Sequence, residues 1–271
     1  MKWFNNMKIG SKLLLGFAVV TLITAIVGIF GLYNMDTINS MANKMYENEL
    51  RGISFLKEAN VNIIASNRAE KNAILAANAS ERHEYVQQII DYDKKARKLF
   101  KKAEPLITSK EGKEIVSKFK DQWEKYKDVG ERIINALKSE NFQKETRAIN
   151  LSQGLGRELS DKLDNMLTRL SKLKDDDAEK YQQMTTQIYK RSFMIMIFLV
   201  IGAVIISFFI GYYISSIIRK PLNRLTFILK DIAEGEGDLT KRVDIDSKDE
   251  IGDVATWFNA FADNIHELVV Q

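Results

Sequence analysis

The chain has 271 residues, of which 45% are hydrophobic and 28% charged, a composition typical of folded rather than disordered proteins. It contains no cysteine and only His83 and His266, which argues against disulfides, thiolate metal sites and imidazole chemistry, so we expect no metal, no other cofactor and no catalytic centre. The formal net charge of +4 is small, and only Pro105 and Pro221 interrupt helical structure, so helix is favoured along most of the chain.

Two segments carry no charged residue: Leu13–Tyr33, with 21 residues, and Phe193–Ile218, with 26. Each is long enough to cross a hydrocarbon core of about 30 Å as a helix, so we predict transmembrane helices over residues 13–33 and 192–218. The alternatives are a buried helix of a soluble domain and, for the first segment, a cleaved signal peptide. The first segment exceeds the apolar run of about 7 to 15 residues of a signal peptide, and no A-x-A cleavage site follows it.

Basic residues flank both spans on what must be the same side of the membrane. Lys2, Lys8 and Lys12 precede the first span, and Arg219, Lys220 and Arg224 follow the second. The positive-inside rule therefore places residues 1–12 and 219–271 in the cytoplasm and residues 34–191 outside the membrane. We expect a multi-pass protein of the inner (cytoplasmic) membrane.

The middle region, residues 34–191, has a helical pattern with three interruptions. Capping boxes begin two helices, Asn78-Ala-Ser-Glu81 and, after Pro105, Thr108-Ser-Lys-Glu111. The stretch Ser139-Glu-Asn141 interrupts the apolar pattern without a glycine or proline. The pattern predicts four helices in an up-down-up-down bundle, over residues 34–77, 80–104, 110–138 and 142–191.

The first and fourth of these helices carry coiled-coil stripes. In the fourth, apolar residues alternate spacings of 4 and 3: Leu159, Leu163, Met166, Leu170 and Leu173. One stripe of the first helix includes Asn60, Asn67 and Glu70, which are costly to bury unless each is paired. A second stripe is rich in small residues, so we expect one face to serve the bundle and the other a second subunit.

The segment 219–271 shows two short apolar stripes joined by a connector. The first stripe is Leu222, Leu225, Leu229 and Ile232, and the second is Ile251, Val254, Phe258, Phe261, Ile265 and Leu268. The connector includes a β-like stretch, Lys241–Ile245, and the second helix opens at Asp249-Glu250. Each helix is too short to be stable alone, so we predict a parallel pair completed by a partner subunit in a homodimer.

Several charge and aromatic patterns have two interpretations. The segment Lys94–Lys102 is basic, but its expected position outside the membrane argues against nucleic-acid binding. It therefore faces either anionic lipid headgroups or solvent. Trp123 and Tyr126, three residues apart, fit bundle core better than a binding cage. Basic residues exceed acidic ones in residues 34–191, which favours an anionic ligand.

The tail resembles a HAMP domain, and the whole chain resembles the sensory half of a bacterial methyl-accepting chemotaxis protein. The HAMP resemblance rests on Pro221, the connector Gly237–Val243, the opening Asp249-Glu-Ile-Gly252 and Phe258-Asn259. The outer region resembles the four-helix-bundle ligand-binding domain of such receptors through Asn67–Asn72, Trp123 with Tyr126, and the long fourth helix. Both resemblances imply an all-α receptor.

This resemblance implies that a small extracytoplasmic ligand sends a conformational signal through the second span to HAMP. Family members continue into a cytoplasmic coiled coil that contacts an adaptor and a histidine kinase, so we expect those partners only through a downstream module that this sequence lacks. The sensory half of a HAMP-containing sensor histidine kinase is the alternative, and a purely structural membrane-anchored dimer is another.

We place the ligand near the upper part of the first helix, by resemblance and because Arg68, Lys71 and Asn72 lie about one turn apart beside the seam residue Asn67. Arg68 is the best single candidate, since a guanidinium binds a carboxylate with two hydrogen bonds; a solvated basic face is the alternative. For signal transmission the candidates are Pro221, which removes a backbone donor and kinks the helix, and, by resemblance, Gly237, Leu239, Val243 and Glu250.

Overall fold

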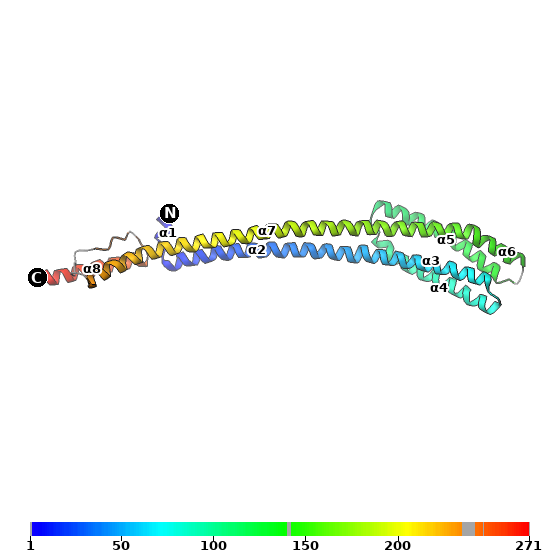
Figure 1. Cartoon of the computed structure of the whole chain (residues 1–271), viewed down its shortest axis with the longest axis horizontal. Helices are drawn as coiled ribbons and strands as arrows, with labels where there is room; N and C mark the ends of the chain where they lie inside the picture. The colour runs from blue at the N-terminus through cyan, green and yellow to red at the C-terminus, as the bar shows by residue number, and fades with distance from the viewer. Residues whose placement is uncertain (1, 140–141, 235–241, 246, 271) are drawn as a thin grey trace. The chain divides into compact units, whose positions relative to one another are not determined.

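The computed structural model describes residues 2–139, 142–234, 242–245 and 247–270, which include every helix of the chain named below (Figure 1). The residues divide into two compact units, each taken here by itself. Asp36–Tyr189 form the bundle unit, and Met1–Met35 with Lys190–Gln271 form the span unit. The predicted all-α class is confirmed.

The bundle unit contains the four predicted helical segments, but two of them are interrupted by π-helical turns. The first comprises the end of α2 (Ile9–Lys44), the π turn η1 (Met45–Leu50) and α3 (Arg51–Leu75). The middle two are α4 (Ala79–Ala103), followed by the 3₁₀ turn Glu104–Leu106, and α5 (Lys110–Leu137). The fourth comprises α6 (Phe142–Leu151), the π turn η3 (Ser152–Gly156) and the start of α7 (Arg157–Glu234). Neither π turn is predicted by the sequence pattern, and each inserts an extra residue into a helix.

Side-chain caps begin α4 and α5, although one cap differs from the prediction. Asn78 Oδ1 accepts from Glu81 N at 2.9 Å, as the predicted capping box requires. Before α5 the cap is Ser109, whose Oγ accepts from Gly112 N at 3.1 Å, and not Thr108. The correction follows from where the helix starts, because Ser109 is the last residue before α5 and Thr108 lies one residue too early.

The bundle core is an aromatic cluster joined to a leucine seam. The rings of Phe100 and Phe119 lie 4.3 Å apart, and Trp123 contacts both edge-on. Trp123 and Tyr126 are buried, which confirms them as bundle core. From α7 the seam buries Leu159, Leu163, Leu167 and Leu170, whereas Met166 and Leu173 are only partly buried.

The span unit contains the two most apolar helical stretches among the described residues. The helical runs Ile9–Leu75 and Gln143–Ile232 contain windows with mean hydropathy 2.7 and 3.0, and none of either window is buried. By length and composition both are able to cross a membrane. The two stretches approach closely at Gly16, where a Cβ atom would lie 2.6 Å from Ile214 Cδ1, so a larger residue would require the Ile214 side chain to move.

The C-terminal part of the span unit is a small domain of two helices and a connector. Leu225 on α7, Val243 on the connector and Ala255 on α8 (Glu250–Val270) form its core. The described connector residues 242–245 form no strand, which corrects the β-like expectation. The side chain of Asn259 makes the two hydrogen bonds to the Val243 backbone that a neighbouring strand would otherwise make. Its Oδ1 accepts from Val243 N at 2.8 Å, and its Nδ2 donates to Val243 O at 2.9 Å.

Candidate functional site

Polar contacts run along the line where α3 faces α7 in the bundle unit, a region we call the α3–α7 seam. It begins at an ion pair between Lys174 Nζ and Glu49 Oε2, 2.7 Å apart, in which each side chain is only 5% exposed. Glu49 belongs to the π turn η1, so this turn places a carboxylate inside the bundle. A buried pair of this kind is costly to break, because removing one partner leaves an uncompensated charge.

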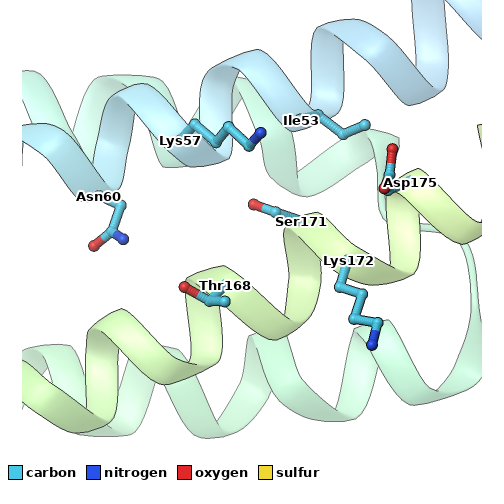
Figure 2. Close-up of a pocket in the computed structure, with 7 residues that line it drawn as sticks. All are labelled: Ile53, Lys57, Asn60, Thr168, Ser171, Lys172 and Asp175. Carbon is cyan, nitrogen blue, oxygen red and sulfur yellow. The ribbon is translucent and has the colours of Figure 1, made fainter.

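Next along the seam lies a cavity of about 330 Å³, which we call the seam pocket (Figure 2). Its lining residues are Ile53, Lys57, Asn60, Thr168, Ser171, Lys172 and Asp175. In Figure 2 Ser171 points into the space between the two helices, and Lys57 extends along α3 toward Ile53. Within the described part of the chain, the charged groups of Lys57, Lys172 and Asp175 form no salt bridge, so their charges are available to a bound molecule.

Asn60 supplies a second feature of the seam pocket. Its Nδ2 donates to Asp164 Oδ1 at 2.5 Å, but its Oδ1 is buried without a hydrogen-bond partner among the described residues. An orphaned buried acceptor costs free energy of about 1 to 3 kcal/mol. A ligand that donates a hydrogen bond there would remove this cost.

Asn67 extends the seam toward the core. Its Oδ1 accepts from the Tyr126 hydroxyl at 2.6 Å, and its Nδ2 donates to Ser160 Oγ. Burial raises the pKa of the Tyr126 phenol, and the negative charge of Glu70 raises it further, so Tyr126 stays a neutral donor. The predicted need to pair Asn67 is therefore met within one chain.

Glu70 is paired at the second π turn. Ser152 Oγ donates to Glu70 Oε1 at 2.5 Å, and Lys71 Nζ lies 3.3 Å from the same oxygen. Lys71 also donates to Ser152 O at 3.1 Å and to Ser152 Oγ. Both π turns thus place a polar residue of the seam, Glu49 in the first and Ser152 in the second.

The structure separates the four ligand candidates into two pairs. Asn67 and Lys71 face the seam and are engaged by Tyr126, Ser160 and Ser152. Arg68 is exposed and Asn72 half-buried, and neither forms a polar contact with another described residue. The sequence analysis missed Lys57 and Asp175, although their spacing from the stripe residues placed them beside the seam.

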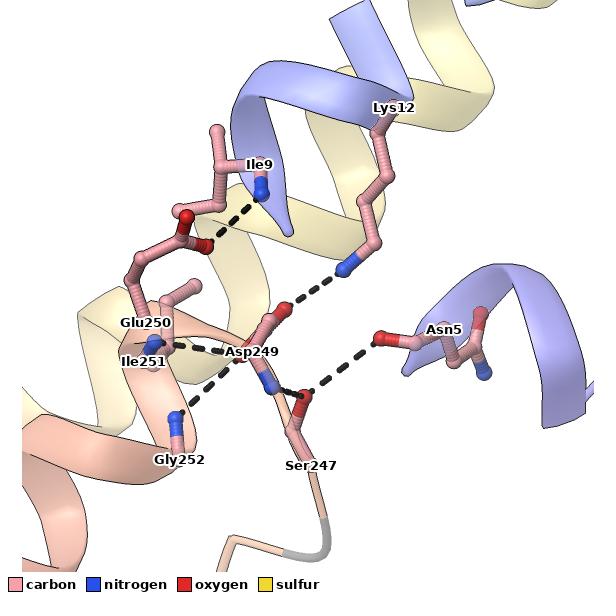
Figure 3. Close-up of polar contacts among 8 residues, drawn as sticks. All are labelled: Asn5, Ile9, Lys12, Ser247, Asp249, Glu250, Ile251 and Gly252. Carbon is pink, nitrogen blue, oxygen red and sulfur yellow. Dashed lines mark hydrogen bonds and ion pairs between the residues drawn. The ribbon is translucent and has the colours of Figure 1, made fainter. Parts of the chain in front are cut away.

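A second cluster, which we call the junction, lies within the span unit where the N-terminus of α2 meets the start of α8 (Figure 3). Lys12 Nζ lies 2.5 Å from Asp249 Oδ2, and the two side chains are 0% and 3% exposed. Asp249 Oδ1 accepts from Ile251 N at 3.1 Å and from Gly252 N at 3.2 Å, which makes it the N-cap of α8. One carboxylate therefore starts α8 and ties it to the N-terminal helix.

Glu250 adds a second bond at the junction, since its Oε2 accepts from Ile9 N at 2.7 Å. This bond lowers the pKa of Glu250. Burial by itself raises the pKa of Asp249, but the hydrogen bonds from Lys12, Ser247 and the Gly252 amide outweigh it, so the net shift is downward. Both carboxylates are therefore held ionised at the point where they meet α2.

Of the five candidates for signal transmission, the structure describes Pro221, Val243 and Glu250. Val243 is buried in the small domain's core, and Glu250 belongs to the junction. Pro221 lies inside α7, which stays helical through it to Glu234, so the proline does not end the helix. Gly237 and Leu239 lie outside the described residues. Within those residues, no group of three histidine, aspartate or glutamate side chains could hold a metal ion.

Comparisons with known proteins match both halves of this architecture. Residues 6–189 match the family model described as a four helix bundle sensory module for signal transduction, and residues 213–267 match the HAMP domain. The methyl-accepting chemotaxis protein CtpM of Pseudomonas aeruginosa is 33% identical over 109 residues, covering 40% of this chain and 18% of that protein. YvaQ of Bacillus subtilis, named as a sensory transducer protein, is 22% identical over 268 residues, covering 97% of this chain and 46% of its own length. The chain thus spans less than half the length of these relatives.

Proposed function

The chain belongs to the family of four-helix-bundle sensory modules for signal transduction and carries a HAMP domain, and on this premise we propose that it is a transmembrane chemoreceptor. The observation that carries the proposal is that both modules match in one chain, in the order sensor and then HAMP. The matched modules are signalling modules, and relatives named as methyl-accepting chemotaxis proteins match parts of this chain, over 109 and 53 residues. In this proposal the receptor senses a small ligand and passes a conformational signal to HAMP.

The proposed topology keeps the boundaries expected from the sequence. Residues 1–12 form a cytoplasmic N-terminus and residues 13–33 the first span. Residues 34–191 form the sensor domain outside the membrane. Residues 192–218 form the second span and residues 219–271 the cytoplasmic HAMP domain. The chain has no native cysteine, which makes a labelling test clean. A membrane-impermeant maleimide added to intact spheroplasts should label Lys125→Cys and leave His266→Cys unlabelled until lysis. Labelling of both or of neither would contradict this topology.

We place the ligand at the seam pocket. The pocket offers the ammonium groups of Lys57 and Lys172, the carboxylate of Asp175 and the unpartnered Oδ1 of Asn60. Such a set fits a small molecule with a carboxylate and a hydrogen-bond donor, as in an amino acid or a hydroxy acid. Arg68, Lys71, Asn72 and Asn67 remain proposed ligand residues, about two to three turns beyond Asn60 along α3.

Thermal unfolding of the full chain in nanodiscs, screened against amino and organic acids, tests both placements. A ligand at 100 times its Kd should stabilise the protein by about 2.7 kcal/mol. We expect Lys57→Gln to remove this stabilisation and the control Lys125→Gln, an exposed cation on α5, to retain it. Loss only with Arg68→Ala would move the site to the upper residues. Stabilisation unchanged in both variants would contradict a ligand at the seam.

The signal in this proposal travels along α7. Lys172, Asp175 and Lys174 of the seam and Pro221 of the small domain belong to this one helix, so a shift at the seam has a continuous path. Val243 and Glu250, with Gly237 and Leu239 by resemblance, would then bias HAMP between two packings, with a coupling of about 1 to 3 kcal/mol. Crosslinking rates between cysteines in α8 should change when ligand saturates the receptor. Identical rates, with binding shown independently, would contradict transmission.

A homodimer is part of the proposal, because the small domain leaves apolar side chains exposed. Exposed large hydrophobic residues recur on α7 and α8: Leu222, Leu229, Val254, Phe261 and Leu268. Leu225, by contrast, is buried against Val243 and Ala255 of its own chain, so it is a poor reporter of subunit contact. Cysteines at Leu222 or Phe261 should crosslink between subunits in membranes, and failure of both would contradict the dimer.

Chemotaxis partners complete the proposal. By family likeness, an adaptor and a histidine kinase would be engaged through a module beyond residue 271. The alternative is the sensory half of a HAMP-containing sensor histidine kinase. The gene sequence that follows residue 271 distinguishes the two, because a kinase carries a catalytic ATP-binding domain and a chemoreceptor a long coiled coil.

A further inference from the structure

A polar cavity of about 550 Å³ lies in the span unit beside the junction, and we call it the boundary pocket. It is lined by Asn5 of α1 (Lys2–Asn5), by α7 residues from Tyr213 to Arg224, and by connector residues including Asp244 and Ser247. Of the expected transmission residues that the structure describes, only Pro221 lines this pocket, and Asp249 of the junction lines it as well. We propose that the boundary pocket binds the phosphodiester headgroup of an anionic membrane lipid.

The charges of the pocket favour an anion. Lys220 and Arg224 line it, and neither forms a salt bridge with any other residue that the structure describes. Two carboxylates also line it, but Asp249 is already neutralised by Lys12. Among the described residues that line the pocket, only Asp244 then opposes the two cations, so these residues carry an excess of positive charge.

The pocket has neutral donors suited to phosphate oxygens. Ser216 carries a hydroxyl group, Asn5 an amide and Tyr213 a phenol, and all three residues line the cavity, whereas the hydroxyl of Ser247, which also lines it, is already engaged within the chain. Ser247 Oγ is 3.4 Å from Asn5 O, which places these two residues together at one wall. A phosphodiester oxygen needs such donors beside the cations, since a headgroup must exchange its water for protein hydrogen bonds.

The pocket also lies at the correct level for a headgroup. Tyr213 belongs to the last part of the proposed second span, and Lys220 and Arg224 follow its end at residue 218. The ring of Phe4 lies 6.0 Å from that of Tyr213, forming an aromatic pair of the kind enriched at membrane interfaces. The inference therefore rests on the proposed membrane topology.

A second subunit would not fill the boundary pocket. Lys220 and Arg224 are four residues apart and share one face of α7, whereas Leu222 lies two residues from each and points the opposite way. Leu222 belongs to the exposed stripe that we assign to the dimer. The cations therefore face outward from the dimer, toward surrounding lipid.

The test titrates the detergent-solubilised full chain with phosphatidylglycerol, phosphatidylcholine or inorganic phosphate and counts bound molecules by native mass spectrometry. The variant is Lys220→Gln with Arg224→Gln; the matched control is Arg219→Gln with Lys230→Gln, which removes two exposed cations of α7 that do not line the pocket. We expect wild type to prefer phosphatidylglycerol. The pocket variant should bind it about 30-fold more weakly, since each cation near a lipid surface contributes about fivefold. The control should retain the preference.

Three results would overturn the proposal: no preference in wild type, an equal loss in the control, which would indicate surface charge alone, or saturation by inorganic phosphate with no preference for lipid, which would assign the site to a free anion. All four side chains changed are exposed, so the fold should persist, and circular dichroism of each variant checks it. Because binding is measured in detergent, failure here is distinguishable from failure of the topology, which the maleimide labelling tests separately.

Discussion

The junction pair of Lys12 and Asp249 gives the sharpest test of how the N-terminal helix is linked to the small domain. Asp249→Asn removes the charge but keeps an oxygen that can cap α8, so it separates the ion pair from the cap. Lys12 would then be a buried ammonium facing an amide, with its own side chain fully buried. Breaking one partner of a buried pair costs about 3 kcal/mol at the lower end of measured values.

Amide hydrogen exchange in the first turn of α8, measured on the full chain in nanodiscs, gives this cost. The amides of Ile251 and Gly252 donate to Asp249, so they exchange only when the junction opens. A loss of about 3 kcal/mol predicts exchange about 150-fold faster in Asp249→Asn. Lys12→Met should show a similar increase, and the double variant should show less than the sum, because no uncompensated charge remains. Exchange within twofold of wild type in both single variants, or strictly additive effects, would refute the reasoning.

The same pair predicts a direction for the pH dependence. Since the pKa of Asp249 is lowered in the folded protein, its stabilising contribution is fully present above the unfolded value and is lost as pH falls through the folded value. Protection of Ile251 and Gly252, corrected for intrinsic exchange rates, should therefore persist down to the ordinary aspartate value of 3.8 and fall only below it. Protection that is lost already near pH 6 would contradict this assignment.

Three further predictions concern the bundle unit. Lys174→Met should destabilise it by about 3 kcal/mol, seen as faster hydrogen exchange in α3, because Glu49 is left buried without its cation. Ser109→Ala should lower the stability of the first turn of α5 by about 1 kcal/mol, measured by amide hydrogen exchange, while Thr108→Ala should leave it almost unchanged. Equal effects of the two substitutions would contradict the cap assignment. In an alkaline titration of phenolate absorbance, wild type and Tyr126→Phe should coincide until strongly alkaline pH, because the raised pKa keeps Tyr126 protonated. A difference between them near pH 10 would show an ordinary phenol.

Local patterns in the sequence were sufficient for the helical architecture. The helix cap at Asn78 depends on a side chain and a backbone amide three residues apart, so four consecutive residues of the sequence were enough to predict it. The buried positions Leu159, Leu163 and Leu170 follow from the period of a helix, which does not depend on what the helix packs against. The two uncharged segments could be identified as candidate membrane spans for the same reason, because length and composition alone decide whether a helix is able to cross a bilayer.

Prediction failed at the cap of α5 and at the two π turns, where residue types alone did not select the local structure. Thr108 and Ser109 can each cap a helix, and only the start of α5 at Lys110 selects Ser109. The two π turns add one residue each to otherwise regular helices, and nothing in the residue types of Met45–Leu50 announces this. The ligand residues stay a prediction: Arg68 is exposed, while Lys71, three residues on, reaches Ser152.

The amino-acid sequence by itself determined the class, the order of the elements and the family likeness, because these follow from periodicity, length and short motifs. Only the tertiary structure decided the pairing of charges, as in Lys12 with Asp249, which lie 237 residues apart, and Lys174 with Glu49, 125 residues apart. The physical reason is that a charged side chain can pair with any opposite charge until packing fixes the register between helices. Burial then makes one pairing far more favourable than the rest, and that choice depends on the whole core rather than on neighbouring residues.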